Sequence, residues 1–226
     1  MSTRGRHHSE LNSSEALLQK AQMIFWDFDG VIKDSVEVKS EGFERLFMPY
    51  GSEVAERVRQ HHEAHGGISR YEKMPVYLGW AGESASADQV QKFCDQFASL
   101  VLQAVIDAPW VPGVREYLIA NHSRQRFILV TATPQQEIER ILQGLELTHC
   151  FQQVHGAPMS KATAIKNVLQ QMQCPAEHAV MVGDTETDLK AAIANHVPFL
   201  LRRTPLNQTL REQYSGLMFD NLGSTI

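Results

Sequence analysis

Short apolar runs alternate along most of the chain with longer stretches in which apolar and charged residues are mixed. The runs that predict strands are 24–26, 127–130, 179–182 and 198–201, with a weaker one at 151–155. Continuous apolar runs of this length, bounded by turn residues, are typical of strands buried on both faces of a parallel sheet. Helical spacing is found between the later runs, at 114–121, 135–145, 161–172 and 189–195. Strands that alternate with helices predict an α/β fold with a doubly wound, Rossmann-like parallel sheet.

The segment between residues 35 and 108 has a different pattern and contains no convincing strand. Amphipathic helices are predicted over 36–48, 53–65, 69–78 and 88–106. A break with two prolines and a glycine at 109–113 then ends the helical pattern. The sequence therefore predicts an α/β core formed by residues 1–34 and 109–226, with an all-helical cap, residues 35–108, inserted into it.

Composition places the chain among ordinary soluble globular proteins. Its 226 residues are 43% hydrophobic and 21% charged, and the formal net charge is −5. A negative chain lacks the basic surface that general nucleic-acid binding requires, and no apolar run is long enough to span a bilayer. Three scattered cysteines without a CxxC pair suit a reducing compartment. We expect a cytoplasmic monomer or homodimer that binds neither nucleic acid nor a membrane.

Polar residues with catalytic potential follow the predicted strands. Asp27 and Asp29 follow the first apolar run, and alternation of side chains along a strand would turn both the same way. Two carboxylates this close repel each other unless a cation lies between them or one is protonated. Thr131 and Asp184 follow two later runs, and ligands bind such sheets at the carboxyl ends of the strands. These four residues are therefore expected to meet in one site.

Four motifs in this order resemble those of the haloacid dehalogenase superfamily. Asp27-Phe28-Asp29-Gly30 follows the first strand, Thr131 a later one, Lys161 begins a helix, and Gly183-Asp184-x-x-x-Asp188 follows another strand. The resemblance covers the predicted core and implies a phosphatase-type member with a helical cap after the first motif. Members that hydrolyse carbon–halogen bonds lack the second aspartate of that motif, so Asp29 favours phosphoryl chemistry.

The resemblance implies a role for each residue around the phosphoryl group. Asp27 would attack phosphorus and form an aspartyl-phosphate. Asp29 would protonate the leaving alcohol and then deprotonate the water that cleaves the intermediate. Thr131, Ala132 and Lys161 would bind the transferring phosphoryl group, with Lys161 neutralising its charge.

The resemblance also implies Mg²⁺ as the cofactor. Asp27, the backbone carbonyl of Asp29, Asp184 and water molecules would complete the octahedral shell that this hard cation requires. Asp188 could be a direct or water-mediated ligand, or could orient Lys161. The metal-site candidates are thus Asp27, Asp29, Asp184 and Asp188.

The cap is expected to choose the substrate. Arg70 is the candidate for binding a second anionic or polar group, because arginine binds carboxylate and phosphate bidentately. The histidines of the 61–65 run lack the His-Glu-x-x-His spacing of zinc proteases and are expected on a polar helix face.

The sequence predicts a Mg²⁺-dependent phosphatase that hydrolyses a small phosphorylated metabolite through an aspartyl-phosphate. Two alternatives remain open at this point. One is a phosphomutase of the same superfamily, whose cap would exclude water and hold a bisphosphate intermediate. The other is a catalytically retired regulatory protein on the same fold. The sequence identifies neither the substrate nor the pathway.

Overall fold

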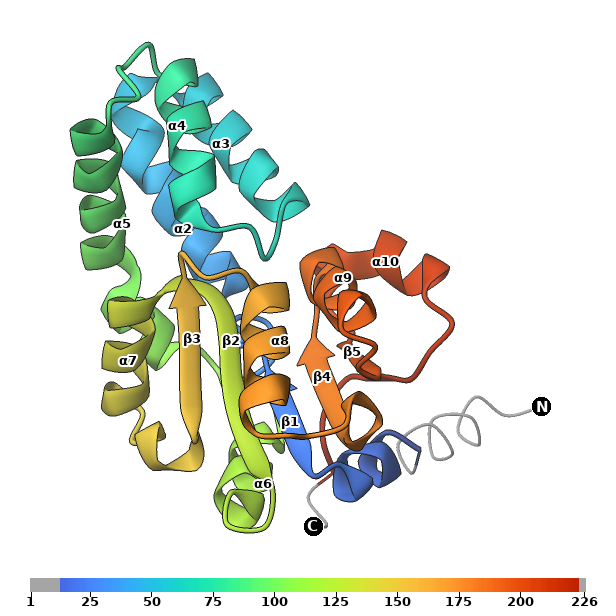
Figure 1. Cartoon of the computed structure of the whole chain (residues 1–226). Helices are drawn as coiled ribbons and strands as arrows, with labels where there is room; N and C mark the ends of the chain where they lie inside the picture. The colour runs from blue at the N-terminus through green and yellow to red at the C-terminus, as the bar shows by residue number, and fades with distance from the viewer. Residues whose placement is uncertain (1–12, 224–226) are drawn as a thin grey trace.

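A six-stranded, wholly parallel sheet forms the centre of the computed structural model, which describes residues 13–223 (Figure 1). Its strands are β1 (Met23–Trp26), β2 (Arg126–Pro134), β3 (Gln153–Ala157), β4 (Ala179–Gly183), β5 (Phe199–Arg202) and β6 (Met218–Phe219). Their order in the sheet is β3-β2-β1-β4-β5-β6. The strand order therefore reverses between β1 and β4, and ligands of doubly wound sheets bind at the carboxyl ends of the strands at such a point.

Helices cover both faces of the sheet. They are α6 (Val114–Asn121), α7 (Gln135–Gly144), α8 (Lys161–Gln171), α9 (Glu186–Ala194) and α10 (Gln208–Gln213), and residues 13–20 are also helical. Ile24 and Trp26 of β1 pack in the apolar layer that contains α6 and α7, whereas Met23 and Phe25 pack in the layer that contains α8 and α9. This alternation explains why the strand is apolar at every position, since neither face meets solvent.

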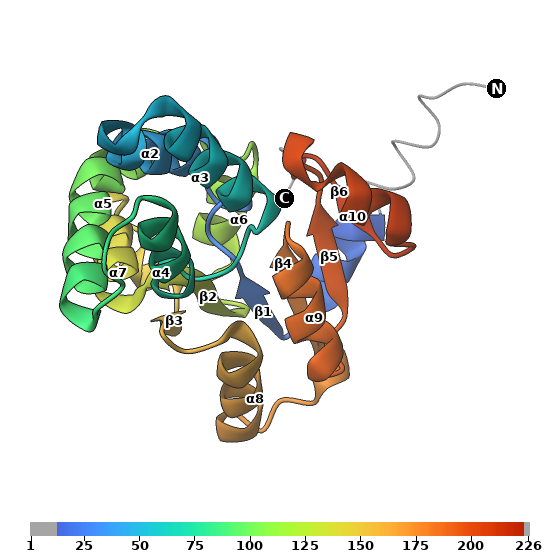
Figure 2. The same ribbon diagram turned by 90° about the horizontal axis from the view of Figure 1, so that it is seen from above.

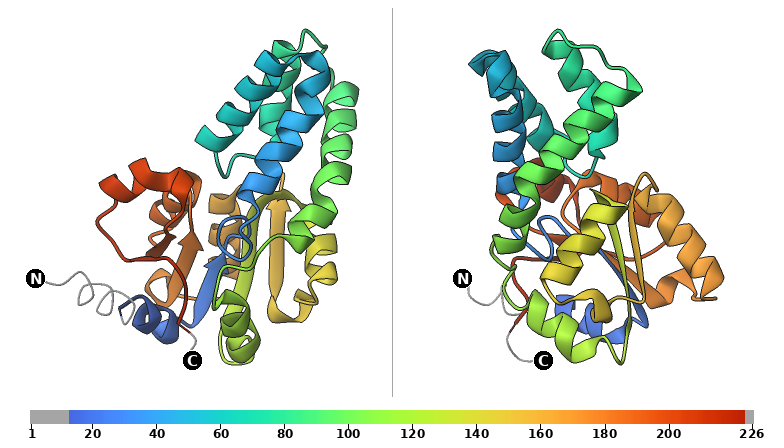
Figure 3. Two further views of the ribbon diagram at one scale, coloured as in Figure 1. Left: turned by 180° about the vertical axis from the view of Figure 1, so that it is seen from behind. Right: turned by 90° about the vertical axis from the view of Figure 1, so that its left-hand side faces the viewer.

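Four longer helices form a cap beyond the carboxyl ends of the strands (Figures 1 and 3). They are α2 (Val36–Phe47), α3 (Ser52–Ala64), α4 (Arg70–Trp80) and α5 (Ala87–Asp107). Seen from above, the cap lies over the side of the sheet that carries α7, with α9 and α10 beside it (Figure 2). Buried aromatic rings hold its helices together, and Phe43 stacks on Phe97 with 3.9 Å between ring centroids.

Two chain crossings connect the cap to the core, and they are hydrogen-bonded to each other. The backbone N–H of Asp34 donates to the carbonyl oxygen of Pro109 at 2.8 Å, and that of Val111 donates to Ile32 at 3.0 Å. Arg202, at the end of β5, holds the first crossing through an ion pair with Asp34 at 2.6 Å. The entry and exit of the cap are thus fixed side by side on the core.

The structure confirms the α/β doubly wound core with a helical cap, and it moves several element boundaries. Helix α9 begins at Glu186 instead of Leu189, because Thr185 and Asp188 form a capping box at its start. The weak strand expected at 151–155 lies at Gln153–Ala157, and β6 and α10 were not expected. The division of the chain at residues 35 and 108 stays a prediction. The three cysteines are free and buried, and none of the helices within residues 13–223 is long and apolar enough to cross a membrane.

Candidate active site

Asp27 and Asp29 lie in the turn that follows β1 and not on the strand itself. The alternation of side chains along a strand, from which their common orientation was predicted, therefore does not apply to them. The strand ends at Trp26, and the backbone N–H groups of residues 31–33 donate to the carbonyl oxygen of Phe28, which closes the turn. Gly30 adopts a φ of +74°, and a Cβ at this position would lie 2.3 Å from Asp184 Oδ2. Glycine therefore allows the β1 turn to approach the β4 turn, and the two aspartates have different partners.

Asp27 faces the ammonium group of Lys161. The distance from Lys161 Nζ to Asp27 Oδ2 is 2.8 Å, and to Asp188 Oδ1 it is 2.6 Å. All three groups are buried, and Ser160 caps the helix that Lys161 begins. Burial and the neighbouring charge of Asp188 raise the pKa of Asp27 to about 7, against the attraction of Lys161. Burial alone would lower the pKa of Lys161, but Asp188 and Asp27 raise it above its usual value.

Asp184 completes a cluster of carboxylates that suits a divalent cation. Oxygens of Asp27, Asp184 and Asp188 lie within 4.8 Å of one another. Asp184 Oδ1 is buried and has no hydrogen-bond partner among the described residues. Burial and the charge of Asp27 raise the pKa of Asp184 well above its usual value. An orphaned buried carboxylate oxygen beside two further carboxylates is a donor set that fits Mg²⁺.

Both carboxylate oxygens of Asp188 already have partners. Oδ1 accepts from Lys161, and Oδ2 accepts from the backbone N–H and the hydroxyl of Thr185, at 3.1 and 2.6 Å. Of the roles that the sequence left open for Asp188, the structure contains the contact that orients Lys161. Its role as a metal ligand stays a prediction.

Asp29 is surrounded by donors that come from both the core and the cap. Its carboxylate accepts from Ser35 Oγ at 2.6 Å and from Thr133 Oγ1 at 3.1 Å, and it pairs with Lys39 of α2. Burial would raise its pKa, but the charge of Lys39 and these hydrogen bonds hold it below its usual value. Asp29 is therefore held as a carboxylate, whereas burial favours the protonated form of Asp27 in the absence of a cation.

Lys39 and Thr133 belong to the site but were not found from the sequence. Lys39 Nζ donates to Thr133 Oγ1 at 2.8 Å, so the two residues support each other and Asp29. A signal for each was present. Thr133 is two residues after Thr131 on an extended segment, and Lys39 is four residues after Ser35 on a helix, so each shares a face with a residue of the site.

Thr131 and Ala132 line the same pocket as the aspartates, which has a volume of about 660 Å³. Thr131 is buried, and its Oγ1 accepts from the backbone N–H of Thr133 at 3.2 Å. The core side of this pocket thus brings together Asp27, Asp29, Thr131, Ala132, Lys161 and Asp184. The structure thus places these residues around one pocket, and the phosphoryl-binding and metal-binding roles predicted for them remain predictions.

Arg70 reaches the pocket from the first turn of α4, and its charge is already paired. Arg70 Nη2 lies 2.6 Å from Glu137 Oε1 on α7, and both side chains are buried. The guanidinium also covers the ring of Phe97 at 4.5 Å. This ion pair joins the cap to the core, so the substrate contact predicted for Arg70 remains a prediction.

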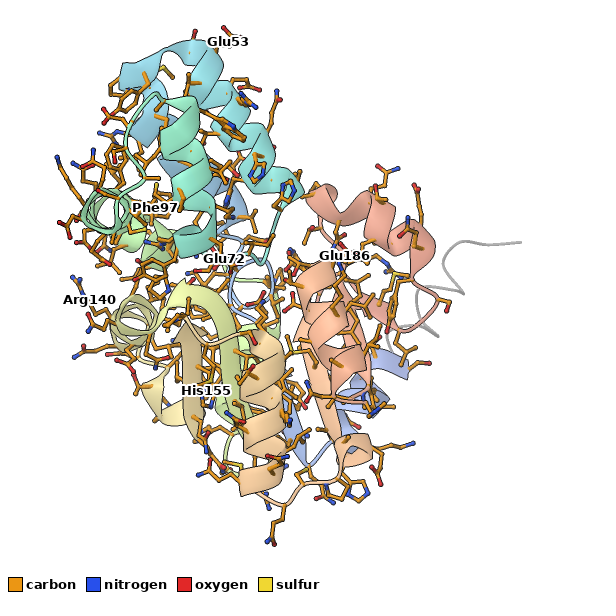
Figure 4. The ribbon with its side chains drawn as sticks, turned by 45° about the horizontal axis from the view of Figure 1, so that its top comes forward. Glu53, Glu72, Phe97, Arg140, His155 and Glu186 are labelled. Carbon is orange, nitrogen blue, oxygen red and sulfur yellow. The ribbon has the colours of Figure 1, made fainter. Side chains whose placement is uncertain are left out.

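The loop between α3 and α4 closes the pocket from the other side. A Cβ on Gly67 would lie 1.9 Å from Thr187 Oγ1, so the glycine lets the cap loop pack against the start of α9. Figure 4 places Glu72, at the start of α4, and Glu186, at the start of α9, on the two sides of this junction. The polar-face prediction for the 61–65 run was wrong for His62, which is buried and packs on Phe43 with 4.7 Å between ring centroids.

Comparisons with known proteins agree with this arrangement. The family described as haloacid dehalogenase-like hydrolase matches residues 24–201. The phosphorylated carbohydrates phosphatase of Thermotoga maritima is 25% identical over 179 residues, which cover 76% of this chain and 80% of the relative.

Solved structures share the fold at lower sequence identity. CbbY from Rhodobacter sphaeroides, solved in complex with phosphate, has a TM-score of 0.72 and 15% identity, covering 90% of this chain and 96% of its own. A haloacid dehalogenase-like family hydrolase from Streptococcus pneumoniae has a TM-score of 0.66 and 20% identity, covering 88% of this chain and 93% of its own. At these identities the likeness concerns the fold.

Proposed function

The chain belongs to the haloacid dehalogenase-like hydrolase family, and from this premise we propose that it is a Mg²⁺-dependent phosphatase acting on a small phosphorylated metabolite. The observation that carries the proposal is the contact of Asp27 with Lys161, beside the orphaned carboxylate of Asp184. The Thermotoga maritima relative is named for phosphorylated carbohydrates, which makes phosphorylated sugars and sugar acids the first substrates to test.

Asp27 is proposed as the nucleophile. Its Oδ1 accepts from the backbone N–H of Phe28 at 2.7 Å, and its Oδ2 contacts Lys161, so the carboxylate is oriented before the substrate arrives. One oxygen of Asp27 attacks phosphorus while the bond from phosphorus to the leaving oxygen breaks, which gives an aspartyl-phosphate. Asp27, Asp184 and the backbone carbonyl of Asp29 would hold Mg²⁺, which when bound supplies positive charge to the phosphoryl oxygens.

Asp29 is proposed to move the proton. In its protonated form it gives a proton to the leaving oxygen, and as a carboxylate it then takes a proton from the attacking water. The resulting hydroxide displaces Asp27 from phosphorus, and inorganic phosphate leaves. The contact with Lys39 favours the carboxylate form of Asp29, which suits the second of these steps, so Asp29 must take up a proton from solvent or substrate before the first.

Lys161, Thr131 and Ala132 would hold the phosphoryl group. Lys161 is the cation nearest to Asp27, and its second partner Asp188 fixes its position. A positioned cation stabilises the charge that spreads over the phosphoryl oxygens in the transition state.

The test is phosphate release from a panel of sugar, nucleotide and acid phosphates, with and without Mg²⁺, by the native protein and by Asp27→Asn. Asn is nearly isosteric but cannot form the acyl phosphate, so turnover should be abolished while circular dichroism stays unchanged. Asp95→Asn, at an exposed position on α5, is the matched control. Activity of Asp27→Asn above about one per cent of the native rate, against enhancements of 10⁶ or more typical of enzymes, would refute the covalent role.

Mg²⁺-dependent net release of phosphate from any ester of the panel would exclude both alternatives. If no phosphate is released, analysis of the sugar phosphates after incubation separates the two. A phosphomutase would move phosphate between positions of a sugar without net release. A catalytically retired protein would release none from any substrate, with or without Mg²⁺.

A further inference from the structure

Lys73 is a buried lysine in the pocket wall that has no carboxylate partner. It lies one turn after Arg70 on α4 and is only 4% exposed. Its Nζ is 2.8 Å from His62 Nδ1 and 3.4 Å from the carbonyl oxygen of His65. None of the ion pairs within residues 13–223 involves it. A buried ammonium group without an anion is costly, so its position calls for an explanation.

His62 orients Lys73 without neutralising it. Burial and the neighbouring charge of Lys73 hold the pKa of His62 well below its usual value, so the imidazole is neutral. With Nδ1 accepting from Lys73, the ring proton of His62 is on Nε2. Burial, Lys39 and Arg70 lower the pKa of Lys73 to about 7. Burial and the two neighbouring cations therefore disfavour the ammonium form of Lys73, and an anion bound beside it would stabilise that form.

The other buried cations of the pocket wall are each matched by a carboxylate. The pairs are Lys39 with Asp29, Arg70 with Glu137, and Lys161 with Asp27 and Asp188. Lys190, also at the pocket, is exposed and pairs with Glu186. On the core side the carboxylate of Asp184 lacks a partner, and a cation fits there. On the cap side the ammonium group of Lys73 lacks a carboxylate partner, and an anion fits there.

We propose that Lys73, positioned by His62, binds a second anionic group of the substrate, so that the preferred substrates are phosphate monoesters with a further phosphate or carboxylate. This inference rests on the proposed phosphatase function. Lys73 and His62 line the same pocket as Asp27 and Thr131, but from the cap, so one molecule can contact both sides. Lys73 meets the second anionic group when the transferring phosphoryl group is bound at the core.

The proposal assigns to Lys73 a contact that sequence reasoning had assigned to Arg70. Arg70 is one turn away, but its charge is already paired with Glu137. An anion that displaced Glu137 would leave a buried carboxylate unpaired, whereas an anion beside Lys73 pairs a charge that has no partner. Among the buried cations that line the pocket within residues 13–223, Lys73 is therefore the one without a carboxylate partner.

The experiment compares kcat/KM for pairs of esters that differ only in the second anionic group. For the carboxylate arm the pair is 2-phosphoglycolate and 2-hydroxyethyl phosphate. For the phosphate arm it is glucose 1,6-bisphosphate with glucose 1-phosphate and glucose 6-phosphate. The variants are Lys73→Met, which keeps the length but not the charge, Lys73→Arg, which keeps the charge, and Lys166→Met, at an exposed position on α8 outside the pocket, as the control. Circular dichroism checks that each variant is folded.

The native protein should prefer the doubly anionic ester in at least one arm. Loss of a hydrogen bond to a charged group corresponds to roughly ten- to a hundredfold. Lys73→Met should reduce the preference by that factor, chiefly through KM, with hydrolysis of p-nitrophenyl phosphate changed less than about twofold. Lys73→Arg and Lys166→Met should retain the preference. No preference in either arm of the native protein, or an unchanged preference in Lys73→Met, would overturn the proposal.

Failure of the phosphatase function would be recognised separately. If the native protein released phosphate from no ester, including p-nitrophenyl phosphate, the proposed function would fail. The subsite is then tested by calorimetric titration of the same ester pairs into Asp27→Asn in the presence of Mg²⁺. Equal affinities for the two members of each pair would overturn the subsite, and a preference removed by adding Lys73→Met would support it.

Discussion

Asp27→Asn should stabilise the protein when no metal is bound, even though it removes the proposed nucleophile. Asp27 is 4% exposed, and burial and Asp188 raise its pKa from 3.8 to about 7. The unfolded chain ionises this carboxyl at lower pH than the folded chain does. As the pH rises from 3.8 to about 7, ionisation of Asp27 therefore increasingly favours the unfolded chain. Above about pH 7 this free-energy penalty on the folded state has reached its full size. Asparagine cannot ionise, so the variant does not carry this free-energy penalty.

The magnitude follows from the two pKa values. At about 1.4 kcal/mol per unit, the penalty is about 2 kcal/mol at pH 5 and about 4 kcal/mol at pH 8, as an upper limit. Lys161 keeps its contact with Asp188, at 2.6 Å, so the substitution leaves no buried ammonium unpaired. For a protein of this size, 1 kcal/mol corresponds to roughly 2–4 °C in Tm. The rise in Tm at pH 8 should therefore be at most roughly 8–16 °C.

The assay is thermal unfolding of both proteins in EDTA at several pH values from 4 to 8, with Asp95→Asn as the control for an exposed aspartate. The difference between Asp27→Asn and the native protein should widen as the pH rises. Excess Mg²⁺ should then stabilise the native protein more than the variant, because the variant lacks one carboxylate of the cluster. A difference that is absent, or that is the same at every pH, would refute the charge-repulsion argument.

Three further predictions concern the metal and the contacts between cap and core. Mg²⁺ should support phosphate release and Ca²⁺ should inhibit it, because Ca²⁺ takes more oxygen ligands at longer distances and can occupy both oxygens of Asp27; full turnover with Ca²⁺ would contradict this. Arg70→Ala leaves the buried carboxylate of Glu137 unpaired, so kcat/KM should fall about ten- to a hundredfold for a sugar phosphate and an aryl phosphate alike. A loss limited to the sugar phosphate would instead support direct substrate binding by Arg70. Gly67→Ala should lower kcat/KM at least about tenfold, because its Cβ would meet Thr187, whereas Gly82→Ala, with φ +73° and open space around it, controls for backbone strain alone; equal effects of the two substitutions would argue against closure at this loop.

The order of elements and the location of the site could be predicted from the sequence because both depend on local pattern. A strand buried on both faces must be apolar throughout, as β1 is, and residues at the carboxyl ends of parallel strands meet at one edge of the sheet. Asp27, Thr131 and Asp184 were identified on these grounds, and the structure places all three around one pocket.

The partners of these residues could not be predicted in the same way. Lys39 reaches Asp29, and Arg70 reaches Glu137, only because α2 and α4 are placed over the sheet at a particular angle. That angle depends on packing between segments that are far apart in the chain. Such packing produces no repeating pattern of residues from which it could be predicted. The burial of His62 has the same origin, since its ring packs on Phe43 and contacts Lys73 inside the cap.

The pairing of the two crossings between cap and core restricts how the cap can move. The Asp34–Pro109 and Ile32–Val111 hydrogen bonds make the crossings a single two-stranded strap, and Arg202 anchors one strand of it. Two separate tethers would let the cap twist and slide, but a strap that keeps its hydrogen bonds bends easily about one axis only. Any opening of the cap that keeps these hydrogen bonds would be restricted to this bending, and closing would return Lys39, Arg70 and Gly67 to the same positions over the core. A cap transplanted from another member of the family would retain this property only if both strands of the strap were exchanged together.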